Sequence, residues 1–270
     1  MPKLSSSALL LAAAGGLSLA ATASADTMYA ASAGYGLNVN LDATLVEVQV
    51  GPLPGGVMGS GSTPYSLSGS VVDLDVDSGN ALATGTVTAD LVTGSASSNV
   101  DGLPGPRTAS ASGGVVGANI DLTTLPLLGS GIPIFAFDGT LSSEASVSGD
   151  SGSFIATGSS TFESLALTVN NVVIDLSAYV GVEVAPNTVI DLDALGLANV
   201  TLTLNQQLVA FDQSSIEVNA LHLDLGVIGV LEGDVTLGHS SASLAAVPEP
   251  ATLLATPCLA ALTLTRRRRR

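Results

Sequence analysis

The sequence predicts an all-β body of the sandwich type, and three observations support this prediction. From Tyr35 onward, short runs rich in Val, Leu, Ile and Thr are separated by Gly, Ser, Asn and Asp, as strands and turns follow one another in all-β domains. Residues 37–42, 71–76 and 200–204 alternate apolar and polar side chains, the pattern of an antiparallel strand with one buried face. Helical periodicity is scarce. A β-solenoid is the alternative, although no fixed repeat period is found.

The first segment, residues 1–25, has the features of an export signal. Lys3 and the amino terminus supply positive charge, residues 8–21 form an apolar stretch, and Ala23-Ser24-Ala25 provides small residues at a cleavage site. This order is typical of a secretory signal peptide. We expect signal peptidase to cut between Ala25 and Asp26.

The body, residues 26–246, is long enough to bury a core of its own. The most apolar stretches, 165–176 and 216–231, predict fully buried strands in the centre of their sheets. Pro and Gly predict loops at 52–64, 102–106 and 125–133. The small residues of 94–101 and 109–114 fit either thin strands or mobile loops.

The last segment, residues 247–270, has three parts. A proline-containing break cannot continue a helix. The apolar run at 251–265 covers, at about 1.5 Å per residue, roughly 22 Å of a ~30 Å hydrocarbon core, so it is a marginal span by itself. Because arginine side chains can reach the head groups from the helix end, we expect it to form a short transmembrane helix in a thinned bilayer. Basic residues beside such a run stay on the cytoplasmic side, which places the body outside. The break is Val247, Pro248, Glu249 and Pro250, and the basic residues are Arg266, Arg267, Arg268, Arg269 and Arg270.

The order of Pro-Glu-Pro, apolar run and arginine cluster resembles the PEP-CTERM sorting signal of bacterial proteins. The resemblance implies that an exosortase, a membrane transpeptidase-like enzyme of bacteria that make exopolysaccharide, recognises the tail and cuts it near Pro248-Glu249-Pro250. It also implies that the precursor is anchored in the inner membrane before this cut.

A second resemblance concerns the later half of the body. Residues 216–223 and 235–243, together with Pro186-Asn187-Thr188 and residues 204–207, are similar to the choice-of-anchor P family of bacterial surface proteins. That family shares an extracellular domain and varies its terminal anchor. The resemblance implies location and architecture and gives no activity.

The composition excludes several classes of function. The body holds nearly all of the 23 acidic residues of the chain, and its single basic residue is Arg107. Such a surface repels phosphate backbones, so nucleic-acid binding is excluded. The one cysteine, Cys258, lies in the tail, so the body has no disulfide. The chain has no tryptophan, so it has few aromatic side chains on which a sugar ring could stack.

One acidic motif invites a calcium hypothesis. Asp73, Asp75 and Asp77 precede Ser78-Gly79-Asn80, and hard cations bind clustered carboxylates. The glycine is one position late for a helix-loop-helix calcium loop, and Thr84 stands where that loop has Glu. A strand with a polar face that ends in a turn explains the same residues. Calcium is therefore the only cofactor to consider, and diffuse cation binding over the acidic surface is the favoured interpretation.

The two histidines, His222 and His239, would form half of a metal site if their strands were neighbours. Ordinary hydrogen-bonded histidines are the favoured interpretation, and the surrounding acids predict that both rings are biased toward the charged form. The Gly59-Ser60-Gly61 run only approximates a nucleophile motif, because no strand-turn-helix context follows it. The chain is therefore predicted not to be an enzyme.

The sequence thus predicts an exported, non-catalytic protein of the cell surface or the extracellular matrix, with exopolysaccharide as a candidate partner. The alternative is an adhesion module that binds a glycan or a protein partner, stabilised by calcium.

Overall fold

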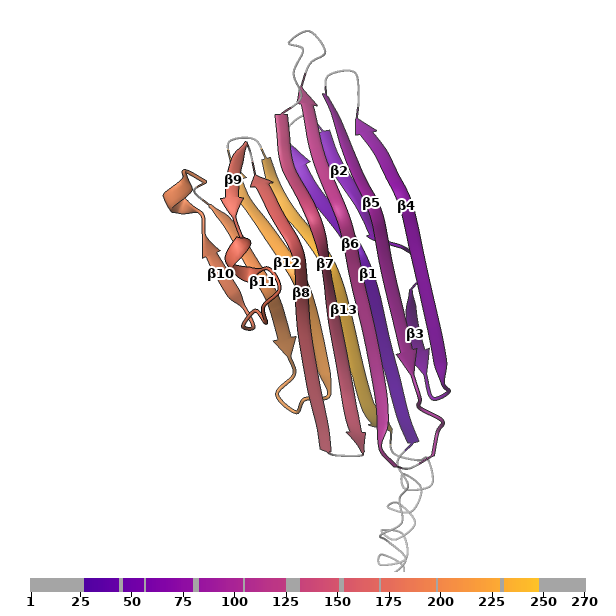
Figure 1. Ribbon diagram of the computed structural model, residues 1–270. Coiled ribbons are helices and arrows are strands. Elements are labelled where there is room, and N and C mark those ends of the chain that lie inside the picture. Colours follow the sequence, from indigo (N-terminus) through magenta and orange to yellow (C-terminus); the bar gives the residue numbers. More distant parts are fainter. Residues whose placement is uncertain are drawn as a thin grey trace, which may run out of the picture.

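The computed structural model describes residues 27–43, 46–55, 57–79, 83–103, 105–124, 132–150, 153–169, 171–197, 199–228 and 231–247. These residues form two antiparallel sheets that pack face to face (Figure 1). The sandwich-like all-β body is therefore confirmed, and the β-solenoid alternative is excluded because neighbouring strands run antiparallel throughout both sheets.

Sheet A has the strand order β10-β11-β12-β13-β1-β2, and β3 pairs with the same edge of β1 as β2 does. Its strands are β1 (Thr27–Ala43), β2 (Val46–Leu53), β3 (Met58–Gly61), β10 (Thr188–Asp191), β11 (Val200–Val209), β12 (Ser215–Ile228) and β13 (Leu231–Val247). Sheet B is a meander in chain order. Its strands are β4 (Tyr65–Gly79), β5 (Ala83–Ser98), β6 (Arg107–Thr124), β7 (Ile132–Asp150), β8 (Ser153–Val169) and β9 (Val172–Asp175).

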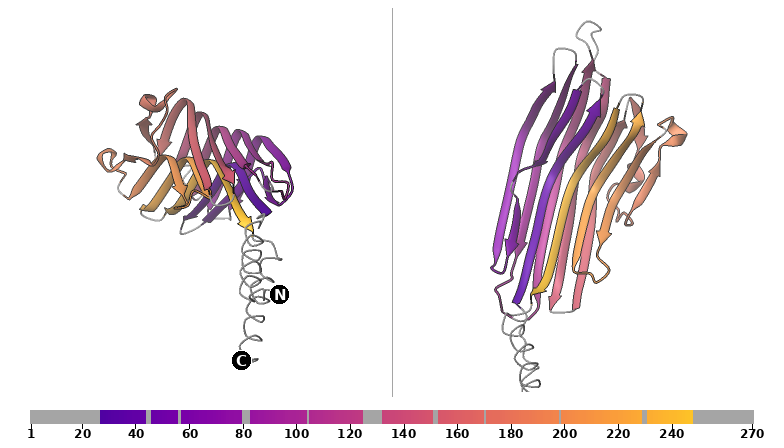
Figure 2. Two further views of the ribbon diagram at one scale, coloured as in Figure 1. Left: turned by 90° about the horizontal axis from the view of Figure 1, so that it is seen from below. Right: turned by 180° about the vertical axis from the view of Figure 1, so that it is seen from behind.

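The first and last described strands lie side by side in the middle of sheet A. Thr27 pairs with Val247, and the register continues to Ala43 opposite Leu231. Figure 2 shows β1 and β13 reaching the same end of the elongated body. We call this end, where Thr27 and Val247 lie, the terminal end, and the opposite end the far end.

The two sheets approach each other most closely at a level we call the glycine waist, formed by Gly34, Gly36, Gly94 and Gly113. A Cβ atom on Gly113 would lie 2.9 Å from the backbone nitrogen of His239, and closer still to the carbonyl oxygens of Tyr35 and His239. Backbone therefore contacts backbone here, whereas stacked sheets are normally about 10 Å apart.

The glycine waist separates two hydrophobic clusters. The larger cluster, toward the far end, contains Leu37, Phe135 and Leu223 among many others. The smaller cluster, toward the terminal end, contains Met28, Val147 and Leu244. Every aromatic side chain in the larger buried cluster is a phenylalanine, and alternating Leu and Val supply most of the remaining volume.

Each sheet carries a line of residues that drop out of the strand pairing, and we call these two lines the bulge lines. Asp73, Gly117, Ser164, Asn205 and Gly238 have φ between 48° and 60°, the left-handed region. One extra residue reverses which side chains face the core. The lines comprise Gly36, Asn205, Ala220 and Gly238 in sheet A, and Asp73, Asp90, Gly117 and Ser164 in sheet B.

One side of the sandwich is closed by two similar elements. Residues 171–178 (NVVIDLSA) form β9 and lead into the 3₁₀ turn η1 (Ser177–Tyr179), and residues 187–194 (NTVIDLDA) form β10 and lead into η2 (Asp193–Leu195). Leu176 and Leu192 occupy equivalent positions and are both 1% exposed. Short edge strands of this kind protect a sheet edge from further pairing.

Several predictions from the sequence are wrong in detail. The stretch 165–176 is not one central strand, because the chain turns near Asn171 (φ 63°) and returns as the edge strand β9. The predicted loop 52–64 contains the end of β2 and all of β3. The small-residue stretches 94–101 and 109–114 are mainly strand, whereas 216–228 is central as predicted.

The predicted signal helix, the cleavage residues Ala23, Ala25 and Asp26, and the apolar helix of the tail lie outside the described residues. Across the part of the chain that the structure describes, there is no helix with the length and apolar character needed to cross a membrane.

Candidate functional site

A polar row crosses the outer face of sheet A beside its bulge line. Tyr35, His239, Asn219 and Gln206 stand opposite one another on β1, β13, β12 and β11. The rings of Tyr35 and His239 stack, with their centroids 4.2 Å apart. The bulge at Gly238 turns His239 outward while Leu237 and Ser240 remain buried.

The hydrogen bonds of this row fix the state of the imidazole. Asn219 Nδ2 donates to Gln206 Oε1 at 2.7 Å, which leaves Asn219 Oδ1 to accept from His239 Nδ1 at 2.7 Å. The ring is therefore protonated on Nδ1. The nearest carboxylate oxygen, Glu217 Oε1, lies 3.8 Å from the same nitrogen.

Burial decides the protonation of this row. It lowers the pKa of His239 from 6.5 to about 4. Burial, followed by the charges of Glu217 and Asp234, raises the pKa of Tyr35 to about 12. The expectation that acidic surroundings favour the charged ring is wrong for His239, because desolvation outweighs the neighbouring carboxylates. Both rings are neutral at neutral pH, and their described partners give them a positioning role in the sheet.

A shallow groove of about 420 Å³ runs across the outer face of sheet A toward the terminal end. Small side chains form most of its floor, and the exposed Met58 lies on one side. Ala31, Ala33, Ser215, Ser241 and Ser243 line it. Nothing in this lining is ionisable except Glu217.

An acidic depression of about 730 Å³ occupies the same face toward the far end. Asp42 stands opposite both Glu47 and Glu232, and Asp224 stands opposite Asp234. Like charges directly opposite one another across strands destabilise a sheet. We call these five residues the acidic face. No Lys or Arg pairs with these carboxylates, because Arg107 is the only Lys or Arg within residues 26–246 and lies in another turn; His222 is the one histidine that lines the depression.

The outer face of sheet B toward the terminal end presents rows of hydroxyl groups in strand register. Ser95 and Ser112 are joined by a 2.7 Å hydrogen bond, and Ser97 and Ser110 by one of 2.8 Å. One row crosses five strands through Ser66, Ser97, Ser110, Ser146 and Thr157. This surface is polar and almost without charge.

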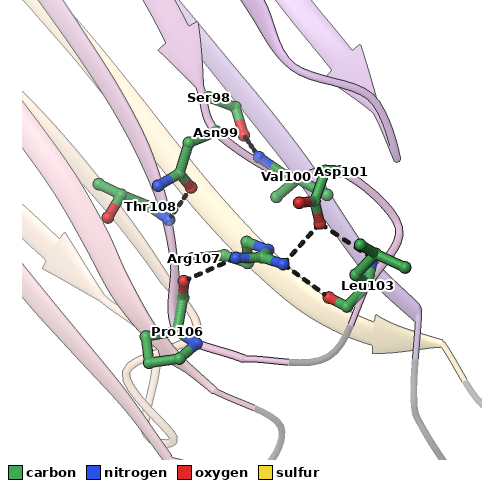
Figure 3. A network of polar contacts seen from close by, with 8 residues as sticks. All are labelled: Ser98, Asn99, Val100, Asp101, Leu103, Pro106, Arg107 and Thr108. Atoms are coloured by element: carbon green, nitrogen blue, oxygen red, sulfur yellow. Dashed lines mark hydrogen bonds and ion pairs between the residues drawn. The ribbon is translucent and has the colours of Figure 1, made fainter.

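The two Nη atoms of Arg107 are bound in the turn between β5 and β6, whereas its buried Nε has no hydrogen-bond partner (Figure 3). Its Nη2 donates to Asp101 Oδ1 at 2.5 Å and to the carbonyl of Leu103 at 3.1 Å. Its Nη1 donates to the carbonyl of Pro106 at 3.2 Å. The same turn is held by the Asn99 Oδ1 that accepts from Thr108 N. The single cation of the body therefore stabilises a turn and is not free to bind an anionic ligand.

The three aspartates of the calcium hypothesis lie on β4. Asp73 occupies the bulge, with Val71 partly buried before it and Leu74 and Val76 partly buried after it. The alternation breaks between Val72 and Asp73, which are both exposed; from there on Asp73, Asp75 and Asp77 are exposed while Leu74 and Val76 are partly buried, so the three aspartates lie on one face as predicted. Asp77 Oδ1 accepts a hydrogen bond from Thr86. In the ranges that the structure describes, no three His, Cys, Asp or Glu side chains come together as a metal-binding group.

The two histidines do not meet. His222 stands opposite Thr236, on the far side of the bulge line from His239, which stands opposite Asn219. The polar row was not found from the sequence as a unit. Its only trace in the sequence is the break in apolar–polar alternation around Gly238 and Asn205. A prediction from periodicity alone interprets such a break as the end of a strand.

Of the predicted sorting residues, Val247 is the last residue of β13. Pro248, Glu249, Pro250 and Arg266 to Arg270 lie outside the described residues. Comparisons with models of known protein families and with curated proteins find no match to this chain.

Proposed function

We propose that this chain is an exported, non-catalytic protein of a bacterial surface or exopolysaccharide matrix, sorted by an exosortase through residues 247–270. The observation that carries the proposal is the order of Pro248-Glu249-Pro250, apolar run and arginine cluster directly after the end of β13 at Val247. A cutting enzyme needs an extended substrate, and proline favours an extended conformation in the residue before it.

The arrangement of the ends supports this proposal. Thr27 and Val247 are paired at the terminal end, so both export signals attach to one end of the body. Strands of 15 to 19 residues extend, at about 3.3 Å per residue, some 50 to 60 Å away from that point. An anchored precursor would thus present the acidic face away from its attachment.

The chemistry of the surface supports a passive role in a hydrated matrix. The acidic face has unpaired like charges, which recruit mobile cations. The described partners of His239 include no nucleophilic hydroxyl, and Arg107, the one arginine within residues 26–246, is bound within its turn.

The test is to follow the full chain in a bacterium that has an exosortase. The triple variant P248A/E249A/P250A should remain uncut in the inner membrane, whereas the unaltered chain should reach the surface fraction. Intact mass of the surface protein should show loss of residues from both ends. The matched control, Glu232→Ala, removes the same charge from the exposed body and should leave processing unchanged. Processing and surface location of the triple variant at the level of the unaltered chain would disprove the sorting role.

The hydroxyl rows of sheet B favour a second candidate, a module that binds a neutral glycan. Their regular, nearly uncharged surface can exchange hydrogen bonds with sugar hydroxyls. Fractionation of the same cells distinguishes the passive matrix protein from the glycan-binding module. Processed protein that stays bound to washed exopolysaccharide at high salt supports the glycan-binding module. Release into the medium by salt supports the passive matrix protein.

A further inference from the structure

The turn between β11 and β12 exposes an apolar cluster. Phe211 is fully exposed, and Leu208 and Val209 are 58% and 48% exposed. The reason lies in the edge of sheet A. Pairing with β10 stops at Leu204. Beyond it, Asn187 N donates to Asn205 O, Gln207 N donates to Asn187 Oδ1 and Asn187 Nδ2 donates to Gln207 O.

This cluster lies toward the terminal end. Ser215 pairs with Ser243, and Leu244 N donates to Ser214 O, so the turn is level with the last residues of β13 (Figure 1). A second exposed apolar side chain, Leu103 at 61%, lies on the turn between β5 and β6, which also faces this end (Figure 3).

Charge is distributed unevenly along the body. The acidic residues of the strands lie mostly at or beyond the bulge lines, toward the far end. On the terminal side the acids of the strands and turns described above include Asp101, Glu144, Asp150, Glu163, Asp212 and Glu217. Asp101 is neutralised by Arg107. Asp212, which follows Phe211, keeps its charge, because the Ser214 hydroxyl and amide donate to its carboxylate and lower its pKa. With fewer carboxylates than the far side, the terminal side is the part of the body that a lipid surface repels less.

The length of the tail brings this end close to the membrane. Only residues 248–250 separate Val247 from the apolar run that begins at residue 251. A fully extended chain covers at most about 14 Å over these steps. While the run is inserted, exposed side chains at the terminal end are within reach of the head-group region.

We propose that the terminal end is a membrane-contact surface in the anchored precursor, with Phe211 and Leu103 seated in the lipid interface. The inference rests on the proposed function, because it requires an inserted tail. Aromatic side chains favour this interface, where an apolar ring and a polar backbone are both accommodated. Such contact would hold the cleavage segment at a fixed height above the membrane.

The absence of tryptophan from the chain makes a direct test possible. Full-length precursor carrying Phe211→Trp or Leu103→Trp is reconstituted in phosphatidylcholine vesicles with plain or brominated acyl chains. The matched control is Val173→Trp, at an exposed position on β9 near the far end. Each variant is first checked for unaltered thermal unfolding, and two terminal-end variants are used so that misfolding of one leaves the other.

The expected result is a blue-shifted emission for both terminal-end tryptophans and loss of roughly half of their fluorescence in brominated vesicles, as suits a side chain about 5–10 Å into the interface. Val173→Trp should be unaffected. If the precursor floats with the vesicles but the terminal-end variants are quenched no more than Val173→Trp, the contact surface is wrong while anchoring stands. If the precursor does not float with the vesicles, anchoring is wrong and the contact surface with it.

Discussion

The buried histidine is the residue whose chemistry departs furthest from its ordinary state. His239 keeps a neutral ring because Tyr35 and the strands around it exclude water, while Asn219 Oδ1 accepts the hydrogen bond from Nδ1–H. Two histidines in an acidic chain predict a charged ring. Only the bulge at Gly238, which places the ring beside Asn219 and out of water, reverses it.

The pH dependence of stability follows from this state. The folded pKa of about 4 lies below the ordinary 6.5, so the unfolded chain takes up a proton first. The neutral ring of His239 therefore makes its full contribution to the free energy of unfolding above pH 6.5. This contribution is lost as the pH falls toward 4, by about 3 kcal/mol at most from this one group. Urea unfolding from pH 7 to pH 4 would measure it.

The control for that measurement is His239→Gln, which retains a donor toward Asn219 and does not titrate. Its free energy of unfolding should fall less between pH 6.5 and pH 4 than that of the unaltered chain. Equal slopes would show that His239 is not the buried neutral base described here.

At the scale of the strands, the glycine waist sets the distance between the sheets. Gly34, Gly94 and Gly113 bring backbone against backbone, so any side chain there must push the sheets apart. The stretches 94–101 and 109–114 fitted either thin strands or mobile loops from sequence, because small residues carry little hydrophobic signal. They are strands because the opposite sheet requires small residues at that level.

Gly113→Ala should be among the most damaging single substitutions in the body. Its Cβ would meet the backbone of Tyr35 and His239, which cannot rotate away as a side chain can. We expect a loss of about 3 kcal/mol or more in the free energy of unfolding, the upper range for overpacking. Chemical denaturation would measure it.

Gly55→Ala is the matched substitution, because its Cβ would have only the Pro52 carbonyl, 3.8 Å away, as a neighbour. It should change stability by no more than about 0.5 kcal/mol, as exposed surface substitutions do. Similar losses for the two variants would contradict the close approach of the sheets at the waist.

At the scale of the whole molecule, charge is divided along the body. The acidic face gathers Asp42, Glu47 and Glu232 as directly opposed neighbours, and the terminal side of the bulge lines carries few acids. Composition predicted an acidic surface that attracts cations. The antiparallel register decided which carboxylates face one another.

Relief of these opposed charges should stabilise the protein. Asp42→Asn removes two like-charge contacts, each worth about 0.2–1 kcal/mol, so its thermal midpoint should rise at low ionic strength and approach that of the unaltered chain in high salt, where charges are screened. Calorimetry in sodium chloride and in calcium chloride of equal ionic strength would measure both effects.

The same experiment separates diffuse from specific cation binding. Diffuse binding predicts similar midpoints in the two salts, and a triple Asp73/Asp75/Asp77→Asn variant that responds to calcium as the unaltered chain does. A thermal midpoint that rises in calcium chloride but not in sodium chloride, and that no longer rises in the triple variant, would support a calcium site at Asp73, Asp75 and Asp77.

The sequence by itself determined the all-β class, because alternation and turn residues are local properties that each strand carries alone. It also predicts the two terminal signals, because that prediction rests on the order of residues alone. The tertiary structure decided which stretches are central, since residues 165–176 turn back on themselves at Asn171 and 216–228 do not. It also decided the polar row, the glycine waist and the bulge lines. These arise where residues distant in the chain, such as Gly113 and His239, meet across or between sheets, and no local pattern encodes that meeting.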